Sequence, residues 1–341
     1  MIPIRNIYYM LSYAFQVLSE QGYKNIATEH FDNVAELCAA ILDKGIAIQL
    51  KRGLGREYIE HTDVLSAIRG RIDLSESIKT QSLQKKQLVC NYDEFSVNFY
   101  MNRIIKTTIE LLLRSDISKN RKKQLKKHLV FFGEVESLDL YNINWKIQYN
   151  RTNQTYRMLI AICYLVIKGL LQTQSDGITR LMDFLDEQRM CRLYEKFILE
   201  YYRKECPQVT ASASQIPWAL DDDIGTMLPV MQSDIMLTKG NNVLIIDAKY
   251  YSHITQTQYD VHTLHSANLY QIFTYVKNKD MEFVDRPHQV SGLLLYAGTD
   301  ETIKPNNSYK MSGNTISVRT LDLNCEFSKI KAQLNSIVDS F

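Results

Sequence analysis

The chain has 341 residues, of which 45% are hydrophobic and 23% are charged, and its formal net charge is +2. This length suits two hydrophobic cores better than one, and the nearly balanced charge argues neither for nor against a nucleic-acid partner. The six cysteines are scattered, without a CxxC pair. No export signal and no run of about 18 apolar residues occurs, so we expect a cytoplasmic protein with neither disulfides nor a membrane span.

The first half of the sequence is expected to be mainly helical. Apolar residues recur at spacings of three and four over residues 5–18, which predicts an amphipathic helix. A second helix is expected over residues 33–50, with a break at Gly45. Short strands and turns are expected next, followed by two longer helical stretches, of which the last should be buried on most sides. These elements cover residues 56–74, 98–130 and 153–172.

One helical stretch in this half is strongly basic. Between residues 103 and 127 it carries nine lysine and arginine side chains against two acidic ones, Glu110 and Asp116. The nine are Arg103, Lys106, Arg114, Lys119, Arg121, Lys122, Lys123, Lys126 and Lys127. Such a stretch is either a solvated helix face or a surface for phosphate or a partner, and the sequence leaves both open.

The pattern becomes polar around residues 173–180, where we expect a boundary between two domains, residues 1–175 and residues 176–341. After a helix over residues 187–204 the hydrophobic period changes to two, which indicates strands. Strands are expected over 208–214, 228–238, 243–250, 291–297 and 315–322, and helices over 264–279 and 325–338. The predicted fold class is therefore α+β overall, with a mainly helical first domain followed by an α/β domain with a mixed central sheet.

One predicted strand, VLIIDAKY, carries charged side chains in an apolar context. Because side chains alternate along a strand, Asp247 and Lys249 point to the same face. If Leu237 of the preceding strand pairs with Leu244, then Asp234 lies opposite Asp247, with Cβ atoms about 5 Å apart. Two carboxylates this close need a cation between them, and their hard oxygen atoms suit Mg²⁺ or Mn²⁺.

Lys249 completes this set of side chains. Beside a metal and a phosphate, an ammonium group can orient or help deprotonate an attacking water and can offset the charge of the transition state. A metal lowers the pKa of its bound water and polarises the phosphoryl oxygen, so the set predicts a phosphodiester hydrolase. The alternative is an exposed hairpin with an ordinary Asp–Lys ladder, which the unbroken apolar run before Asp247 disfavours.

The segments SDI and VLIIDAKYY resemble the signature of PD-(D/E)xK nucleases. The resemblance implies that Asp234 is the first acid and that Asp247, Ala248 and Lys249 form the D-x-K element. It also implies that the carbonyl group of Ala248 adds a metal ligand. The literal Pro-Asp pair is absent, since Pro229 precedes Asp234 by several residues.

Two helices extend this resemblance. NLYQIFTY places Gln271 and Tyr275 four residues apart on one helix face, like the Q-x-x-x-Y element of RecB-like members, where they would help seat the catalytic strand or the DNA backbone. Glu195, in LYEKF, stands where many members place an acid that reaches the metal or its water. The alternatives are that Gln271 and Tyr275 are polar residues at the edge of the core, and that Glu195 is solvated or structural.

The segments IPIRNIYYMLSYAF, IRGRIDL and NRIIKTTIELLL, followed by the nuclease motif, resemble the McrC subunit of the McrBC 5-methylcytosine restriction system over essentially the whole chain. The resemblance implies an endonuclease that cuts double-stranded DNA with modified cytosine beside McrB, a hexameric AAA+ GTPase that reads the modified base. It also implies that residues 1–175 dock on the McrB ring and stimulate its GTPase. GTP would be bound by that partner, because this chain has no G-x-x-x-x-G-K-[ST] motif.

The first domain has no catalytic set of its own. Its candidates Arg5, Asn6, Arg69 and Arg71 either make local caps and surface salt bridges or act on partner residues near the nucleotide. Two other functions stay open. One is a non-catalytic regulatory subunit with a vestigial nuclease fold, and the other is a stand-alone repair nuclease of the RecB-like kind.

Overall fold

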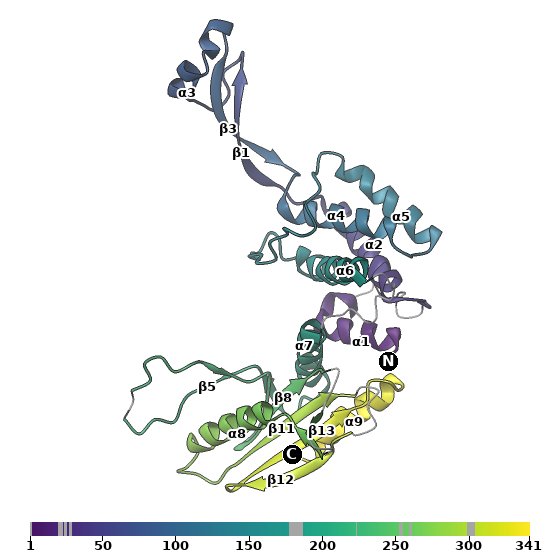
Figure 1. The fold of residues 1–341 in the computed structure, drawn as a ribbon, viewed down its shortest axis with the longest axis vertical. Helices are drawn as coiled ribbons and strands as arrows, with labels where there is room; N and C mark the ends of the chain where they lie inside the picture. The colour runs from purple at the N-terminus through teal and green to yellow at the C-terminus, as the bar shows by residue number, and fades with distance from the viewer. Residues whose placement is uncertain are drawn as a thin grey trace. The chain divides into compact units, whose positions relative to one another are not determined.

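The computed structural model describes residues 2–19, 23, 26, 29–176, 187–222, 224–251, 255–258, 261–298 and 304–341. Contacts divide the chain into two compact units (Figure 1). The helical unit comprises Asp32–Phe184, and the sheet unit comprises Met1–Phe31 together with Leu185–Phe341. Among the described residues, no helix is long and apolar enough to cross a membrane.

Helices form the body of the helical unit. They are α2 (Val34–Arg52), α4 (Tyr100–Arg114), α5 (Lys119–Leu129), followed by the short η4 (Val130–Phe132), and α6 (Tyr156–Asp176). α2 begins where the side chain of Asn33 accepts a hydrogen bond from the backbone N–H of Glu36 at 2.8 Å. The predicted break at Gly45 is wrong, because α2 continues through this buried residue. Its packing against α5 and α6 outweighs the roughly 1 kcal/mol that an internal glycine costs a helix.

An arm built on a three-stranded sheet extends from these helices (Figure 1). It is made of β1 (Glu57–Leu65), β2 (Arg71–Ile72), α3 (Leu74–Lys79), η3 (Ser82–Lys85) and β3 (Leu88–Ser96), with β1 and β2 both antiparallel to β3. Gly70, just before β2, has a φ of +68°, and a Cβ atom there would collide with the carbonyl oxygen of Asn91, so the turn requires glycine. The strands and turns expected over residues 56–74 are present, whereas α3 and β3 were not predicted.

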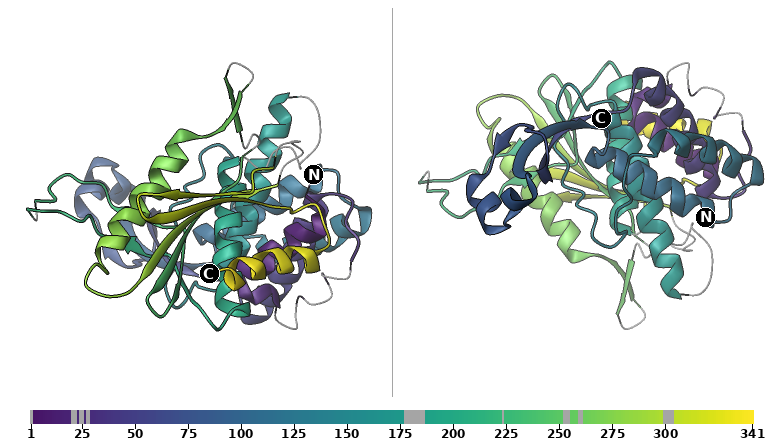
Figure 2. Two further views of the ribbon diagram at one scale, coloured as in Figure 1. Left: turned by 90° about the horizontal axis from the view of Figure 1, so that it is seen from below. Right: turned by 90° about the horizontal axis from the view of Figure 1, so that it is seen from above.

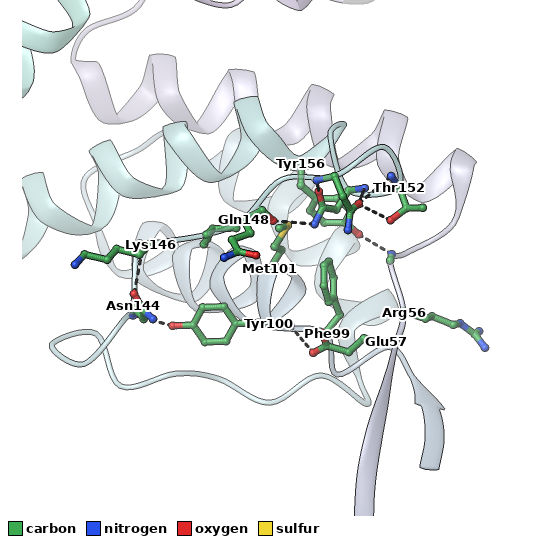
Figure 3. A pocket seen from close by; sticks show the side chains of 14 residues that line it. Arg56, Glu57, Phe99, Tyr100, Met101, Asn144, Lys146, Gln148, Thr152 and Tyr156 are labelled. Carbon is green, nitrogen blue, oxygen red and sulfur yellow. Dashed lines mark hydrogen bonds between the residues drawn. The ribbon is translucent and has the colours of Figure 1, made fainter. Parts of the chain in front are cut away.

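A buried hydrogen-bond network holds both ends of this arm. The hydroxyl of Tyr156 accepts from the N–H of Gly55 at 2.6 Å and donates to Oδ1 of Asn102 at 2.7 Å. The side-chain amide of Asn102 donates to the carbonyl groups of Gly55 and Val97, each at 2.9 Å. Gly55 precedes β1 and Val97 follows β3, so the network joins the two strand ends beside a pocket of about 470 Å³ (Figure 3).

The sheet unit is built on a mixed sheet with the strand order β12-β13-β11-β8-β7-β4, which confirms the predicted architecture. Its parallel strands are β8, β11 and β13, and the others join antiparallel. The bounds are β4 (Thr210–Ser212), β7 (Ile235–Lys239), β8 (Asn242–Lys249), β11 (Gln289–Ala297), β12 (Asn307–Met311) and β13 (Asn314–Leu321). Two short ladders pair β5 (Gln215–Ile216) with β6 (Met231–Gln232) and β9 (Thr255–Gln258) with β10 (Val261–Leu264).

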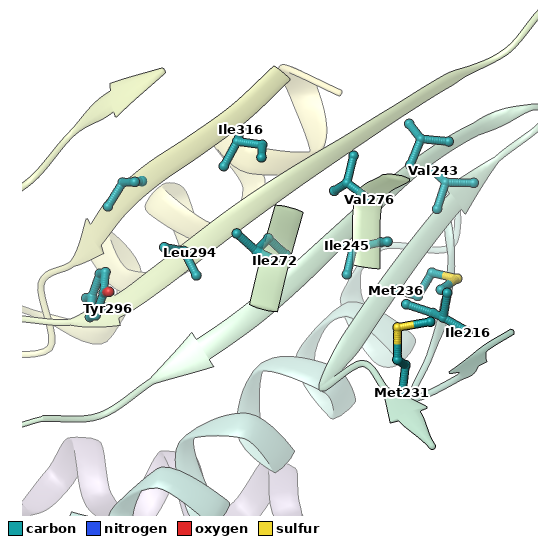
Figure 4. Packing of buried hydrophobic residues seen from close by; sticks show 12 residues of the cluster. Ile216, Met231, Met236, Val243, Ile245, Ile272, Val276, Leu294, Tyr296 and Ile316 are labelled. Atoms are coloured by element: carbon teal, nitrogen blue, oxygen red, sulfur yellow. The ribbon is translucent and has the colours of Figure 1, made fainter. Parts of the chain in front are cut away.

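Helices cover both faces of this sheet (Figure 2). α8 (Ser266–Met281) lies on one face, and α7 (Glu187–Glu205) and α9 (Phe327–Asp339) lie on the other. From α8, Ile272 and Val276 pack on Ile245, Leu294 and Ile316 of the central strands (Figure 4). This packing fixes which side of α8 faces β8.

The N-terminal helix α1 (Ile4–Ala14), followed by η1 (Gln16–Ser19), belongs to the sheet unit. The hydroxyl of Tyr13 donates to Oε1 of Glu205 in α7 at 2.7 Å, and the side-chain amide of Asn6 donates to the carbonyl groups of Leu323 and Cys325. The sequence-based division, which placed this helix in the first domain, differs here because the contacts are long-range. Residues 177–180, the second half of the boundary expected over residues 173–180, lie outside the described residues.

Candidate active site

The two acids of the predicted motif are brought together by strand pairing. Leu237 pairs with Leu244, as the sequence suggested, and the antiparallel ladder continues to Ile235 and Ile246. Asp234, immediately before β7, therefore lies opposite Asp247 of β8. Its Oδ2 atom accepts a hydrogen bond at 2.9 Å from the backbone N–H of Ala248. The apolar run VLII places β8 in the centre of the sheet, so the acids at its end are shielded from solvent.

Asp247 is the most buried charged group of this site, with only 2% of its surface exposed. Its Oδ1 atom lies 2.9 Å from Nζ of Lys249. Its Oδ2 atom is buried and has no hydrogen-bond partner among the described residues. A buried carboxylate oxygen without a partner is costly, so this atom can accept a further donor or a cation beside Lys249.

The electrostatics of the site follow from the crowding of acids. Burial, then the charges of Asp247 and Glu195, raises the pKa of Asp234 to about 8. Burial lowers the pKa of Lys249, but the neighbouring carboxylates of Asp247 and Asp234 outweigh it, so the net pKa is raised and the amine stays protonated. The raised pKa of Asp234 favours its protonated form, and a divalent cation would compete with that proton.

Helix α7 brings a third acid to the site. Glu195 is half-buried, and burial raises its pKa. The thiol of Cys191, one helical turn earlier, donates to Oε1 of Glu195 at 3.0 Å and lies 3.7 Å from the carbonyl oxygen of Ala248. Burial, with the hydrogen bond to Glu195, raises the pKa of Cys191 to about 12, so the group is a thiol. Sequence reasoning missed Cys191, although its i, i+4 spacing from Glu195 is visible.

Helix α8 brings the two remaining predicted side chains to Lys249. Nζ of Lys249 donates to Oε1 of Gln271 at 3.4 Å, and Nε2 of Gln271 donates to the hydroxyl of Tyr275 at 3.0 Å. Lys249 is thus held between Asp247 on its own strand and Gln271 on the covering helix. These contacts place Gln271 and Tyr275 on one face of α8, near β8.

The donor atoms at this edge of the sheet suit a hard cation. Among the described residues, no group of three or more His, Cys, Asp and Glu side chains is arranged to hold a metal ion. Two carboxylates and a backbone carbonyl are nevertheless an acceptable set for Mg²⁺, which keeps several waters. Asp234 lies opposite Asp247 and accepts from the N–H of Ala248, whose carbonyl oxygen lies 3.7 Å from Sγ of Cys191. The unpartnered Oδ2 atom of Asp247 fits such an ion.

The candidates of the N-terminal half have different surroundings. Asn6 is buried and structural, and Arg5 donates to the hydroxyl of Tyr9 at 3.3 Å. Arg69 lies over the ring of Tyr92, 4.0 Å from its centroid. Arg71 is exposed and makes no hydrogen bond or ion pair within the described part of the chain. The pocket at the base of the arm is lined by neither Asp234 nor Asp247.

Comparison with known proteins places the chain in a family. The sequence model described as "McrBC 5-methylcytosine restriction system component" matches residues 4–297. An Escherichia coli K12 protein, named type IV methyl-directed restriction enzyme EcoKMcrBC, is 28% identical over 346 residues, which cover 100% of this chain and 98% of that protein.

Two solved structures are also similar. One is a half-complex from a tetradecameric assembly of Thermococcus gammatolerans McrB AAA+ hexamers with bound McrC; it is 18% identical, covers 98% of this chain and 76% of the matched chain, and has a TM-score of 0.49. The other is the cryo-EM structure of the Thermococcus gammatolerans McrBC complex. It is 19% identical, covers 50% of this chain and 55% of the matched chain, and has a TM-score of 0.38. On the family match over most of its length, the chain belongs to the family of McrBC 5-methylcytosine restriction system components.

Proposed function

We propose that the chain is the endonuclease subunit of a modification-dependent restriction complex and that it hydrolyses DNA phosphodiesters with Mg²⁺ or Mn²⁺. Membership of the McrBC family supports the restriction role. The observation that carries the chemistry is the buried, unpartnered Oδ2 atom of Asp247, beside Lys249 and opposite Asp234. An exposed Asp–Lys ladder would be solvated, so none of its carboxylate oxygens would be both buried and without a hydrogen-bond partner.

Each side chain of the site has a distinct role in this proposal. Asp234, Asp247 and the carbonyl group of Ala248 would hold the metal, and Glu195 would bind one of its waters. When bound, the metal supplies a lowered pKa for water and positive charge at the phosphoryl oxygen. Lys249 stays protonated because Asp247 lies 2.9 Å from it, so we assign it to binding and neutralising the scissile phosphate rather than to accepting a proton.

Gln271 and Tyr275 act through Lys249. The 3.4 Å contact from Lys249 to Gln271 and the 3.0 Å contact from Gln271 to Tyr275 restrict where the ammonium group can lie. A phosphate-binding cation loses much of its effect when it is misplaced by about 1 Å. We therefore propose both as positioning residues.

The partner in this proposal is a McrB-like hexameric AAA+ GTPase that binds GTP and reads the modified cytosine of double-stranded DNA. The helical unit would dock on it through the tip of its arm. There Ile68, Leu74 and Ile78 are 61–66% exposed, which is unusual for a surface that meets only water. Arg71, exposed beside them in sequence, is our candidate for acting on the partner's nucleotide site.

The test is cleavage of methylated and unmethylated plasmid with Mg²⁺, with and without the McrB-like partner and GTP, using the Asp247→Ala chain in parallel. We expect cleavage of methylated plasmid only with partner and GTP, lost in Asp247→Ala while stimulation of the partner's GTPase persists. Cleavage by the chain alone would instead identify a stand-alone nuclease. Stimulation of the GTPase without any cleavage by the unmodified chain would identify a regulatory subunit.

A further inference from the structure

Helix α5 of the helical unit carries an unusual concentration of positive charge. Its sequence, KNRKKQLKKHL, contains six lysine and arginine residues and no acid. Lys119, Lys123, Lys126 and Lys127 are exposed, and Lys122 is half-buried. None of these five lysines makes a hydrogen bond or ion pair with another described residue. We infer that they form a surface that binds the phosphate backbone of duplex DNA, independently of the nuclease site.

The structural needs of α5 are met by other residues. The side chain of Ser118 caps the helix by accepting from the N–H of Arg121 at 3.2 Å, and Leu125 is fully buried. The nearby acid Asp43 is already paired with His128, at 2.8 Å, and with Arg121, at 3.5 Å. The lysines therefore take no part in attaching α5 to the rest of the unit.

The lysines also work against the helix that carries them. Lys119 and Lys123, and Lys123 and Lys127, are like charges four residues apart, which destabilises a helix. Lys119 in addition lies in the first turn, at the positive end of the helix dipole, where a cation is unfavourable. Only Lys126 and Lys127, in the last turn, have a favourable position in this respect. A solvated face normally mixes both signs of charge, so an unbalanced row indicates that the counter-charge comes from outside.

Duplex DNA fits this row better than other anions. Three lysines at spacings of four residues span about 12 Å of helix, close to the rise of three to four phosphates along one strand. Lysine is a point charge without the fork that arginine uses for base edges, so contacts of this kind hold DNA without reading its sequence. Val130 and Phe131, 77% and 61% exposed just beyond α5, are the features that an acidic protein partner would use instead.

The proposal is tested with the full chain carrying Lys123→Gln and Lys127→Gln, which removes two exposed charges and keeps good helix formers. The matched control, Lys51→Gln with Lys146→Gln, removes two exposed charges elsewhere in the same unit. Binding to a short unmethylated duplex is measured over a series of salt concentrations without divalent metal, so that no cleavage occurs. The slope of log K against log salt is negative. We expect it to be less steep by about 1.8 in the α5 variant and to change little in the control.

Several results would overturn the proposal. One is that the unmodified chain does not bind the duplex. Another is that the α5 variant and its control have equal salt slopes. A third is that the α5 variant binds DNA as before but binds the McrB-like partner more weakly. Asp247→Ala serves as the reference for the nuclease, since it should keep the salt slope of the unmodified chain. If the unmodified chain cleaves DNA but the α5 variant has the same slope of log K against log salt, this inference is refuted and the proposed nuclease function is not.

Discussion

Replacing Asp247 with asparagine keeps the shape of a buried side chain and removes one of two facing carboxylates. In the unmodified chain, burial and then the charges of Asp247 and Glu195 raise the pKa of Asp234 from 3.8 to about 8. A carboxyl group with a raised pKa binds its proton more tightly in the folded state than in the unfolded state. The stability it contributes is therefore complete below the unfolded value of 3.8 and is lost as the pH rises through about 8.

The magnitude follows from the size of this window. One proton taken up on folding changes the free energy of unfolding by about 1.4 kcal/mol per pH unit. Between pH 3.8 and about 8 the loss for Asp234 is about 6 kcal/mol, which is an upper value because Asp234 and Asp247 titrate together. Asp247→Asn removes the charge repulsion and leaves the burial, so we expect a clearly smaller slope over the same window.

The assay is urea unfolding of the full chain in EDTA at a series of pH values within this window, for the unmodified chain and for Asp247→Asn. Added Mg²⁺ should stabilise only the unmodified chain, by about 2.7 kcal/mol at a concentration of one hundred times its dissociation constant. Equal pH slopes in the two chains, or equal stabilisation of both by Mg²⁺, would refute the coupling between the two acids on which the site is built.

Three further changes test other parts of the molecule. Lys249→Met should lower single-turnover cleavage by a factor of at least about 100 while duplex binding persists, and cleavage within tenfold of the unmodified rate would contradict its role at the phosphate. Tyr275→Phe removes one neutral hydrogen bond from Gln271, so single-turnover cleavage should fall by about fivefold and Mg²⁺ affinity should not change; an altered Mg²⁺ affinity would place Tyr275 at the metal instead. Tyr156→Phe leaves the N–H of Gly55 without a partner, which should lower the free energy of unfolding in urea by about 1–3 kcal/mol, and an unchanged value would show that the arm is held by other contacts.

The sheet unit was predictable because its signal is local. An unbroken apolar run with charges at its end indicates a central strand, and the pairing of Leu237 with Leu244 follows from the intervening turn. β3 was missed because its sequence, LVCNYDEFS, does not alternate regularly between apolar and polar residues, and most of its side chains are exposed or half-buried on an arm. α1 groups with the sheet unit, and not with the residues that follow it in sequence, because its partners, such as Glu205, are nearly two hundred residues away.

The types and spacing of the residues predicted which side chains belong to the candidate site. They did not predict how these side chains are arranged there. The i, i+4 spacing of Gln271 and Tyr275 places them on one face of α8, whereas their approach to Lys249 depends on Ile272 and Val276 packing on the sheet. The same holds for Cys191, whose contact with the Ala248 carbonyl arises only when α7 covers β8. Helix-to-sheet packing is a tertiary effect that a periodic pattern does not contain.

The balance of charge at this site limits what it can bind. Its charged side chains are Asp234, Asp247, Glu195 and Lys249, which sum to three negative charges and one positive, a formal excess of two negative charges. Burial makes such an excess expensive, and the raised pKa of Asp234 shows that the chain alone relieves it only by holding a proton. One divalent cation cancels the excess in full. A phosphodiester brings one negative charge back, and Lys249, already protonated and held by Gln271, is the group placed to meet it.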